Sequence, residues 1–244
     1  MSRTLPTLRR LREARRERRS RRACCGFDTV PFDHHAPRER LEQLVADEAL
    51  EMFEGEIPVG HALDLGIGDG DHALWLAARG YEVEGVDVNA HALHRAELRA
   101  KRLNLWLQTF LADVRDFPIL PDSYDLIVAA ALLHFLPPDS LPTLAERIVA
   151  GLKPGGYVYA SVLTTDDPGY ALLRASGAAE VAPNTFDTAD MGIGPTLHYF
   201  RKGELRALFP TPDVVHYAEE RYLRPGSEQG YNAAAALLAR KPSA

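Results

Sequence analysis

The chain has 244 residues and a net charge of −6, with 46% hydrophobic and 25% charged residues. These values are ordinary for a globular protein, and the length suits one α/β domain with a full core. No apolar run approaches the length of a membrane span. The two cysteines, Cys24 and Cys25, are adjacent, which excludes a disulfide framework and a zinc-ligand spacing. A cytoplasmic location is therefore expected.

The charge is distributed unevenly along the chain. Residues 1–22 hold ten arginines and two glutamates, whereas the remainder is acidic. Such a composition is typical of a solvated tail, so residues 1–30 are predicted to form a disordered basic arm before a single domain over residues 31–241. An arm that contacts RNA stays open as an alternative. The acidic body argues against nucleic acid as the main substrate, because phosphate binding needs a basic face.

Helices and strands are predicted to alternate along the domain. An amphipathic helix over residues 38–54 comes first. Strands are expected at residues 62–65, 81–86, 105–111, 126–133 and 157–162, with helices over residues 71–79, from Asn89 to 103, and from Asp139 to 152. This alternation with short loops predicts a doubly wound α/β fold, with a mostly parallel sheet between two layers of helices.

Residues 164–195 interrupt the pattern with glycines, prolines and small side chains. A long irregular segment within a compact domain is typically a functional loop, and this one follows the fifth strand, at the sheet edge where ligands bind. It is therefore predicted to be a lid, with Phe186 and Met191 covering the reacting group. A helix over residues 201–209 follows. Residues 214–222 and 231–240 are predicted to close the sheet as an antiparallel pair, although the alanines of the second favour a helix.

A glycine-rich turn after the first strand is the most informative motif. Gly66, Gly68 and Gly70 alternate along the chain, and glycine lets a ligand approach the backbone closely. The N–H groups of the next helix attract an anionic ligand group. Asp87 ends the second strand and offers two acceptor oxygens to a ribose diol. This order predicts a nucleotide-type cofactor site. The glycine spacing disfavours a nicotinamide oxidoreductase, the alternative of another class.

These motifs, together with Asp113 after the third strand and residues 124–128 before His134, resemble the class I S-adenosylmethionine-dependent methyltransferases. Residues 63–78, 153–157, 200–206 and 238–241 are similar to the tellurite-resistance methyltransferase group. The resemblance implies a Rossmann-like sheet of seven strands with an antiparallel final strand, and S-adenosyl-L-methionine as the cofactor. It also implies methyl transfer to a small molecule, with a soft chalcogen or a thiol as acceptor. Leu223-Arg224 stands where that group has a His-Arg pair, so the acceptor itself is not carried over.

The resemblance assigns roles to individual residues. Asp64 would face the cofactor's ammonium, the glycine turn its methionine part, and Val88 the adenine ring. Asp113 and the Val114 N–H would bind the adenine edge, and the carbonyls that end the fourth strand would point at the site. The complete set predicted to bind the cofactor is Asp64, Gly66, Ile67, Gly68, Gly70, Asp87, Val88, Asp113, Val114, Ala129 and Ala130.

Two residues are candidates for handling the acceptor. His134 follows the fourth strand, and a pKa near neutrality would suit a base in a small-metabolite O- or N-methyltransferase, which is the alternative within this fold. A packing role for His134 stays open. Arg224 would hold an anionic substrate. His72, at the start of the helix after the glycine turn, is assigned a structural role. His34 and His35 have no convincing third ligand, so no metal site is predicted.

Overall fold

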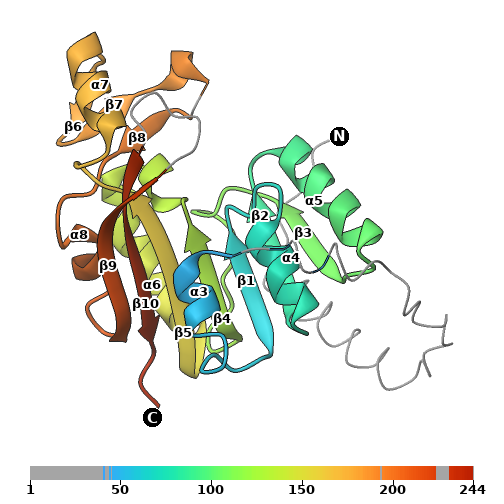
Figure 1. The fold of residues 1–244 in the computed structure, drawn as a ribbon. Helices are drawn as coiled ribbons and strands as arrows, with labels where there is room; N and C mark the ends of the chain where they lie inside the picture. Colours follow the sequence, from blue (N-terminus) through green and yellow to red (C-terminus); the bar gives the residue numbers. More distant parts are fainter. Residues whose placement is uncertain (1–40, 42–43, 45, 193, 224–230, 244) are drawn as a thin grey trace, which may run out of the picture.

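The computed structural model describes residues 41, 44, 46–192, 194–223 and 231–243, so the predicted basic arm lies outside the described residues. A seven-stranded sheet in the order β3-β2-β1-β4-β5-β10-β9 forms its centre (Figure 1). The strands are β1 (His61–Leu65), β2 (Glu82–Asp87), β3 (Leu107–Leu111), β4 (Tyr124–Ala130), β5 (Leu152–Leu163), β9 (Asp213–Leu223) and β10 (Tyr231–Arg240). The first five strands are mutually parallel, and β10 runs antiparallel to both β5 and β9. The predicted fold class is confirmed.

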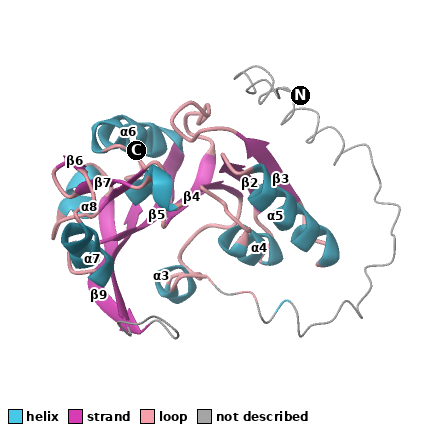
Figure 2. Ribbon diagram, turned by 90° about the horizontal axis from the view of Figure 1, so that it is seen from above, coloured by secondary structure: helices cyan, strands magenta, loops and turns pink. Residues whose placement is uncertain are grey.

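Helices cover both faces of the sheet (Figure 2). One layer contains α3 (Glu48–Met52), α4 (Asp71–Ala78) and α5 (Ala90–Arg102), and the other contains α6 (Leu141–Gly151) and α8 (Glu204–Leu208). Successive side chains of a strand point to opposite faces. Leu63 and Ile127 therefore pack with α6 and α8, while Ala62 and Leu126 pack with α3, α4 and α5. This double coverage explains why the central strands are apolar along their whole length. No helix in the described part of the chain has the length and apolar character needed to span a bilayer.

Several predicted element boundaries are wrong. The helix predicted over residues 38–54 is found as the shorter α3, because residues 44, 46 and 47 are not helical and α3 begins at Glu48. Two further differences lie around β4 and α6. The fourth strand ends at Ala130, because Ala131 takes a left-handed backbone with φ 48° and a 3₁₀ turn, η1 (Leu133–Phe135), follows. The apolar residues of the sequence continue beyond the end of β4 because Leu133, in the turn η1, is also buried in the core. Asp139 does not cap the next helix: it lies in a second 3₁₀ turn, η2 (Pro138–Ser140), and Ser140 occupies the N-cap of α6.

The segment predicted to be irregular folds into an insert, defined here as residues 164–198. It contains α7 (Pro168–Ser176), a small antiparallel sheet and a 3₁₀ turn, η3 (Ala189–Met191). The strands of the small sheet are β6 (Glu180–Ala182), β7 (Thr185–Asp187) and β8 (Thr196–His198). Phe186 and Leu197 are buried in a separate apolar cluster with Tyr199, and Tyr170 packs against it. These aromatic contacts supply the apolar burial that holds the insert together.

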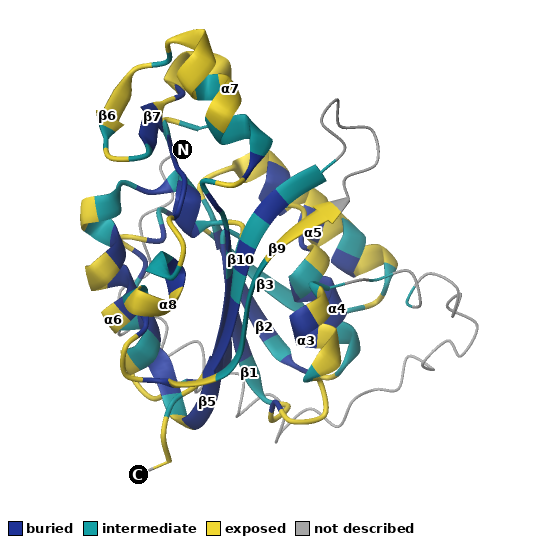
Figure 3. Ribbon diagram, turned by 60° about the vertical axis from the view of Figure 1, so that its left-hand side comes forward, coloured by how far each residue is buried: buried dark blue, intermediate teal, exposed yellow. Residues whose placement is uncertain are grey.

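The insert lies beyond the carboxyl end of β5 (Figure 1), and its outer surface is largely exposed while β5 and β10 are buried (Figure 3). The backbone carbonyl of Phe135 in η1 accepts a hydrogen bond from the Thr196 hydroxyl at 3.4 Å. The Phe135 ring packs against the cluster around Phe186. The insert is thus anchored to the segment that leaves β4, at the sheet edge that carries the glycine turn.

Candidate active site

The glycine turn after β1 holds three left-handed glycines with different surroundings. A Cβ on Gly66 would lie 2.7 Å from a methyl group of Leu132, and one on Gly70 would lie 2.9 Å from the Cβ of Ala96. These two glycines allow the turn to pack closely. At Gly68, with φ 53°, a Cβ would find only the Gly66 carbonyl oxygen, at 4.0 Å. Gly68 is therefore the position of the turn that leaves room for a ligand to reach the backbone.

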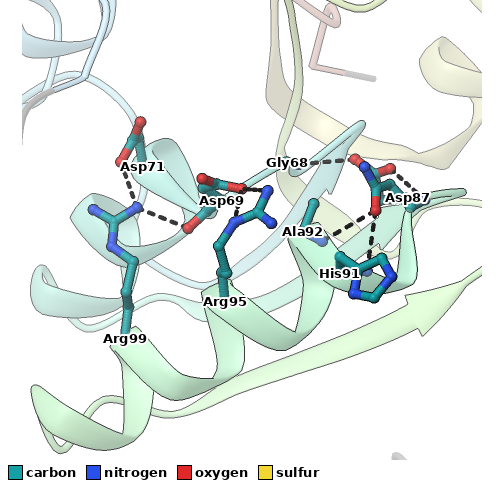
Figure 4. Close-up of polar contacts among 9 residues, drawn as sticks. Gly68, Asp69, Asp71, Asp87, His91, Ala92, Arg95 and Arg99 are labelled. Atoms are coloured by element: carbon teal, nitrogen blue, oxygen red, sulfur yellow. Dashed lines mark hydrogen bonds and ion pairs between the residues drawn. The ribbon is translucent and has the colours of Figure 1, made fainter. Parts of the chain in front are cut away.

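Asp87 connects the end of β2 to this turn. Its Oδ2 accepts the Gly68 N–H at 2.9 Å and its Oδ1 accepts the Asn89 N–H at 2.8 Å (Figure 4). Each carboxylate oxygen has two lone pairs, so both oxygens keep capacity for a ribose hydroxyl. The sequence predicted that the turn and the acid belong to one site, and the structure brings them into direct contact.

Two arginines of α5 form ion pairs with acidic residues in the glycine turn and at the start of α4. Arg95 pairs with Asp69 at 2.6 Å, and Arg99 pairs with Asp71 at 2.6 Å (Figure 4). The hydrogen bond with Arg95 keeps the pKa of Asp69 below its usual value. Sequence reasoning missed these contacts. Their only signal was the spacing of four residues that puts both arginines on one face of the helix.

Asp64, in β1, is 2% exposed. Burial raises the pKa of this carboxyl, the nearby His72 lowers it and the charge of Asp87 raises it again, to about 7. A buried acid with a perturbed pKa beside a turn of this kind is a candidate for a functional residue. A cationic ligand group there would restore the charged form, as the predicted contact with the cofactor's ammonium requires.

Exposed apolar side chains lie beside Asp87. Val88 is 68% exposed, and Leu111, whose Cα pairs with that of Asp87 across β2 and β3, is 37% exposed. Exposed apolar side chains at the carboxyl ends of adjacent strands suit a flat ring such as adenine. Val88 therefore fits its predicted role, and Leu111 is an addition that the sequence did not single out.

Other predicted cofactor residues are placed differently. Asp113 is engaged by Arg115, whose Nη2 lies 2.6 Å from Oδ2, so a ligand would have to share this carboxylate. The side chains of Ile67, Val114 and Ala129 are buried in the two cores, which leaves only their backbone groups for a ligand. Ala130 is partly exposed at the end of β4. Arg224 lies outside the described residues.

His134 does not fit the role of a general base. It is 3% exposed, and its Nδ1 accepts the Leu163 N–H at 3.3 Å. Burial, with a smaller effect from His198, lowers the pKa of His134 to about 4. The ring is therefore neutral at physiological pH, and the lone pair at Nδ1 is already used. The structure supports the packing role that the sequence left open.

A polar cluster on the α3–α5 side of the sheet escaped sequence analysis. Asp47 precedes α3, and its Oδ2 accepts hydrogen bonds from the hydroxyls of Tyr159 at 2.5 Å and Ser161 at 3.2 Å. Its Oδ1 lies 3.4 Å from Nε2 of His72. Only His72 was noted from the sequence. Nothing in the spacing of these four residues indicates that β5, α4 and the segment before α3 meet.

Known proteins resemble this chain in sequence and in fold. Residues 62–156 match the family described as methyltransferase domain. The probable S-adenosyl-L-methionine-dependent methyltransferase TehB of Haemophilus influenzae (strain 10810) is 30% identical over 106 residues, which cover 43% of this chain and 37% of TehB. Hemagglutinin 1 of Eikenella corrodens is 33% identical over 158 residues, which cover 64% of this chain and 45% of that protein. The chain thus spans less than half of the length of these curated relatives.

Solved structures agree on the fold. An S-adenosylmethionine-dependent methyltransferase of Methanosarcina mazei has a TM-score of 0.66 at 20% identity, over 79% of this chain and 98% of that one. The structure of TehB from Haemophilus influenzae has a TM-score of 0.62 at 22% identity, over 81% of this chain and 62% of that one. Residues 62–156 thus match a methyltransferase domain, and the sheet order of the chain agrees with the fold of solved S-adenosylmethionine-dependent methyltransferases.

Proposed function

We propose that the protein transfers the methyl group of S-adenosylmethionine to a small molecule whose acceptor atom is a soft nucleophile such as sulfur, selenium or tellurium. The observation that carries the proposal is the contact between the Asp87 carboxylate and Gly68 beside the exposed Val88. When bound, the cofactor supplies a methyl group made electrophilic by its sulfonium. The chain's own residues bind and orient it: Asp64 takes the ammonium, Asp87 the ribose, and Val88 with Leu111 the adenine.

Positioning accounts for much of the rate in this mechanism. Holding two reactants in attack geometry contributes at most roughly 7–11 kcal/mol to lowering the barrier. A soft acceptor that is already ionised needs no base from the protein. The buried and hydrogen-bonded His134 agrees with such an acceptor, because the alternative O- or N-methyltransferase relied on that histidine as its base. The tellurite-resistance group that the sequence resembles suggests the same class of acceptor, although this chain has Leu223-Arg224 where that group has a His-Arg pair.

An assay of S-adenosylhomocysteine formation against a panel of acceptors tests the proposal. The panel contains tellurite, selenite, 2-mercaptoethanol, a simple phenol and a primary amine. We expect turnover with soft acceptors and none with the phenol or the amine. Turnover confined to the phenol or the amine would overturn the acceptor class. Calorimetric binding of a nicotinamide dinucleotide but not of S-adenosylhomocysteine would overturn the function altogether.

A further inference from the structure

The tip of the glycine turn is held by side chains. Residues 67–70 form a tight turn, closed by a 2.9 Å hydrogen bond from the N–H of the last residue to the carbonyl of the first, with Gly68 and Asp69 at its tip. The Gly68 N–H donates to Asp87 at 2.9 Å, and the Asp69 carbonyl accepts from Arg99 at 2.7 Å. Asp87 ends β2 and Arg99 lies on α5, which begins after only two more residues. The position of the tip therefore depends on this one segment.

Two arginines of α5 reach the turn through four hydrogen bonds. Nε and Nη2 of Arg95 donate to Oδ1 of Asp69 at 3.0 and 2.6 Å. Nη1 of Arg99 donates to the Asp69 carbonyl at 2.7 Å and to Oδ1 of Asp71 at 2.6 Å. Figure 4 shows both side chains extending from the helix to the turn. Hydrogen bonds between charged groups are shorter and stronger than neutral ones, and the planar guanidinium fixes their direction.

A turn that contains three left-handed glycines gains most from such restraint. Glycine has more backbone conformations available than other residues, so an unrestrained turn populates several of them. Gly68 is the position of the turn with room for a ligand. A ligand that binds only one conformation of the turn has an apparent affinity reduced by the fraction of molecules in that conformation. Side chains that restrain the tip can therefore raise the affinity without touching the ligand.

The same arginines balance the acidic charge beside the start of α4. The hydrogen bond with Arg95 keeps the pKa of Asp69 below its usual value, so this carboxylate is charged at neutral pH. Without the arginines, Asp69 and Asp71 would repel the anionic ligand group that the sequence predicts at this helix terminus. The four side chains of the two ion pairs are between 35% and 64% exposed, so dissolved salt screens their interaction.

We propose that Arg95 and Arg99 are positioning residues that hold the glycine turn in its cofactor-binding conformation and thereby set the affinity for the cofactor. Both arginines act through Asp69 and Asp71. The inference rests on the proposed function, because it concerns the site assigned there to S-adenosylmethionine, but it does not depend on the acceptor.

Substitutions on α5 test the proposal by calorimetry with S-adenosylhomocysteine. Arg99 makes its contacts through one nitrogen, so Arg99→Lys keeps a charged donor whereas Arg99→Gln loses the charge. Because exposed ion pairs are weak, affinity should fall about fivefold in Arg99→Gln and about tenfold when Arg95→Gln is added. Arg99→Lys should stay within about twofold of the wild type. Arg102→Gln is the matched control: it removes the same charge from an exposed position in the last turn of α5 and should not change the affinity.

Three further readouts separate positioning from a general loss of stability. In the double variant, the KM for S-adenosylmethionine should rise while kcat at saturating cofactor stays the same. The Gly68 amide should exchange faster in the ligand-free double variant, whereas the melting temperature should change little because exposed ion pairs contribute little to the free energy of unfolding. Added sodium chloride should lower the affinity of the wild-type protein more steeply than that of the double variant.

The outcomes distinguish this inference from the function on which it rests. Unchanged affinity in a folded double variant, or an equal loss in Arg102→Gln, would overturn the inference and leave the proposed function in place. Equal losses in Arg99→Lys and Arg99→Gln would overturn it as well, because a charged donor at this position would then have no effect. Failure of the wild-type protein to bind S-adenosylhomocysteine would instead overturn the proposed function.

Discussion

At the residue scale, Asp87 combines two tasks. Its carboxylate accepts the N–H of Gly68 in the turn, and we propose that it also binds the ribose of the cofactor. Asp87→Ala removes both, so we expect cofactor affinity to fall more than tenfold, which corresponds to about 1.4 kcal/mol. Calorimetry with S-adenosylhomocysteine measures this loss. Asp87→Asn keeps one acceptor oxygen, so its cofactor affinity should fall less than that of Asp87→Ala. Unchanged affinity in a folded alanine variant would exclude Asp87 from the cofactor site.

The raised pKa of Asp64 leads to the prediction that cofactor binding depends on pH. Burial raises its pKa in the free protein to about 7, and the cofactor's ammonium favours the charged carboxylate. Binding below pH 7 must therefore release a proton, so affinity should be constant above about pH 8 and fall as the pH decreases through 7. Calorimetry with S-adenosylhomocysteine at several pH values checks this direction. Asp64→Asn should bind more weakly and lose the dependence. A wild-type affinity that rises toward low pH would contradict the assignment.

A substitution at Gly70 tests how closely the glycine turn packs against α5. Its φ of 87° already disfavours a side chain, and an added Cβ would lie 2.9 Å from Ala96. Gly70→Ala should cost roughly 1–2 kcal/mol for the backbone conformation and about 1–3 kcal/mol for the overpacking. Gly177→Ala is the control, because Gly177 has φ 76° and open space around it. Chemical denaturation should show the larger loss of stability at Gly70. Equal losses of stability in the two variants would mean that Ala96 can move away from the added Cβ with no loss of free energy.

At the scale of elements, sequence periodicity predicted the sheet well and the insert poorly. Each strand that packs on both faces carries an apolar run, so local pattern and tertiary environment agree. β10 is the informative exception: Ala234 pairs with Leu163 on one side and with Glu220 on the other, and this double pairing overrides the helical propensity of alanine. In the insert, strands of three residues are too short to show a period, and the buried Phe186 resembled an isolated apolar residue.

The site shows the same limit. The proximity of Asp64, Gly68 and Asp87 was predictable, because they follow one another along a single β-α-β unit. The cluster of Asp47, His72 and Tyr159 was not, because its members come from positions far apart in the chain that only the folded sheet brings together. The surroundings of His134 also come from distant positions, since its Nδ1 accepts the N–H of Leu163 on β5 and His198 of the insert contributes to lowering its pKa.

The insert stays a proposed lid, with different roles for its two apolar residues. Phe186 is buried within the insert, so Phe186→Ala should unfold this segment locally; a buried Phe→Ala change costs about 3–5 kcal/mol. Met191 is 46% exposed, so Met191→Ala should keep stability but lower turnover more than cofactor affinity. Amide exchange of residues 164–198 should slow when S-adenosylhomocysteine and an acceptor are bound. Unchanged exchange, with normal turnover in Met191→Ala, would contradict a lid.

At the scale of the whole molecule, the acidic body and the basic N-terminal segment are predicted to act separately. Residues 1–22 have too few apolar side chains to join a core. Their deletion should leave the melting temperature and the turnover of any identified acceptor unchanged. Thermal unfolding and the methyl-transfer assay check both. Salt-dependent RNA binding that disappears with the deletion, in a protein without methyl transfer, would favour the RNA-binding alternative.

The position of β10 also bears on how the protein is made. β10 lies between β5 and β9, although both of these precede it in the chain. A nascent chain that has emerged only as far as β9 therefore has no partner for that strand, and the outer edge of β5 is unpaired. Unpaired edges are sites of association between chains. A ribosome paused before residue 231 would thus hold an aggregation-prone intermediate, and completion of the sheet must wait for the synthesis of β10.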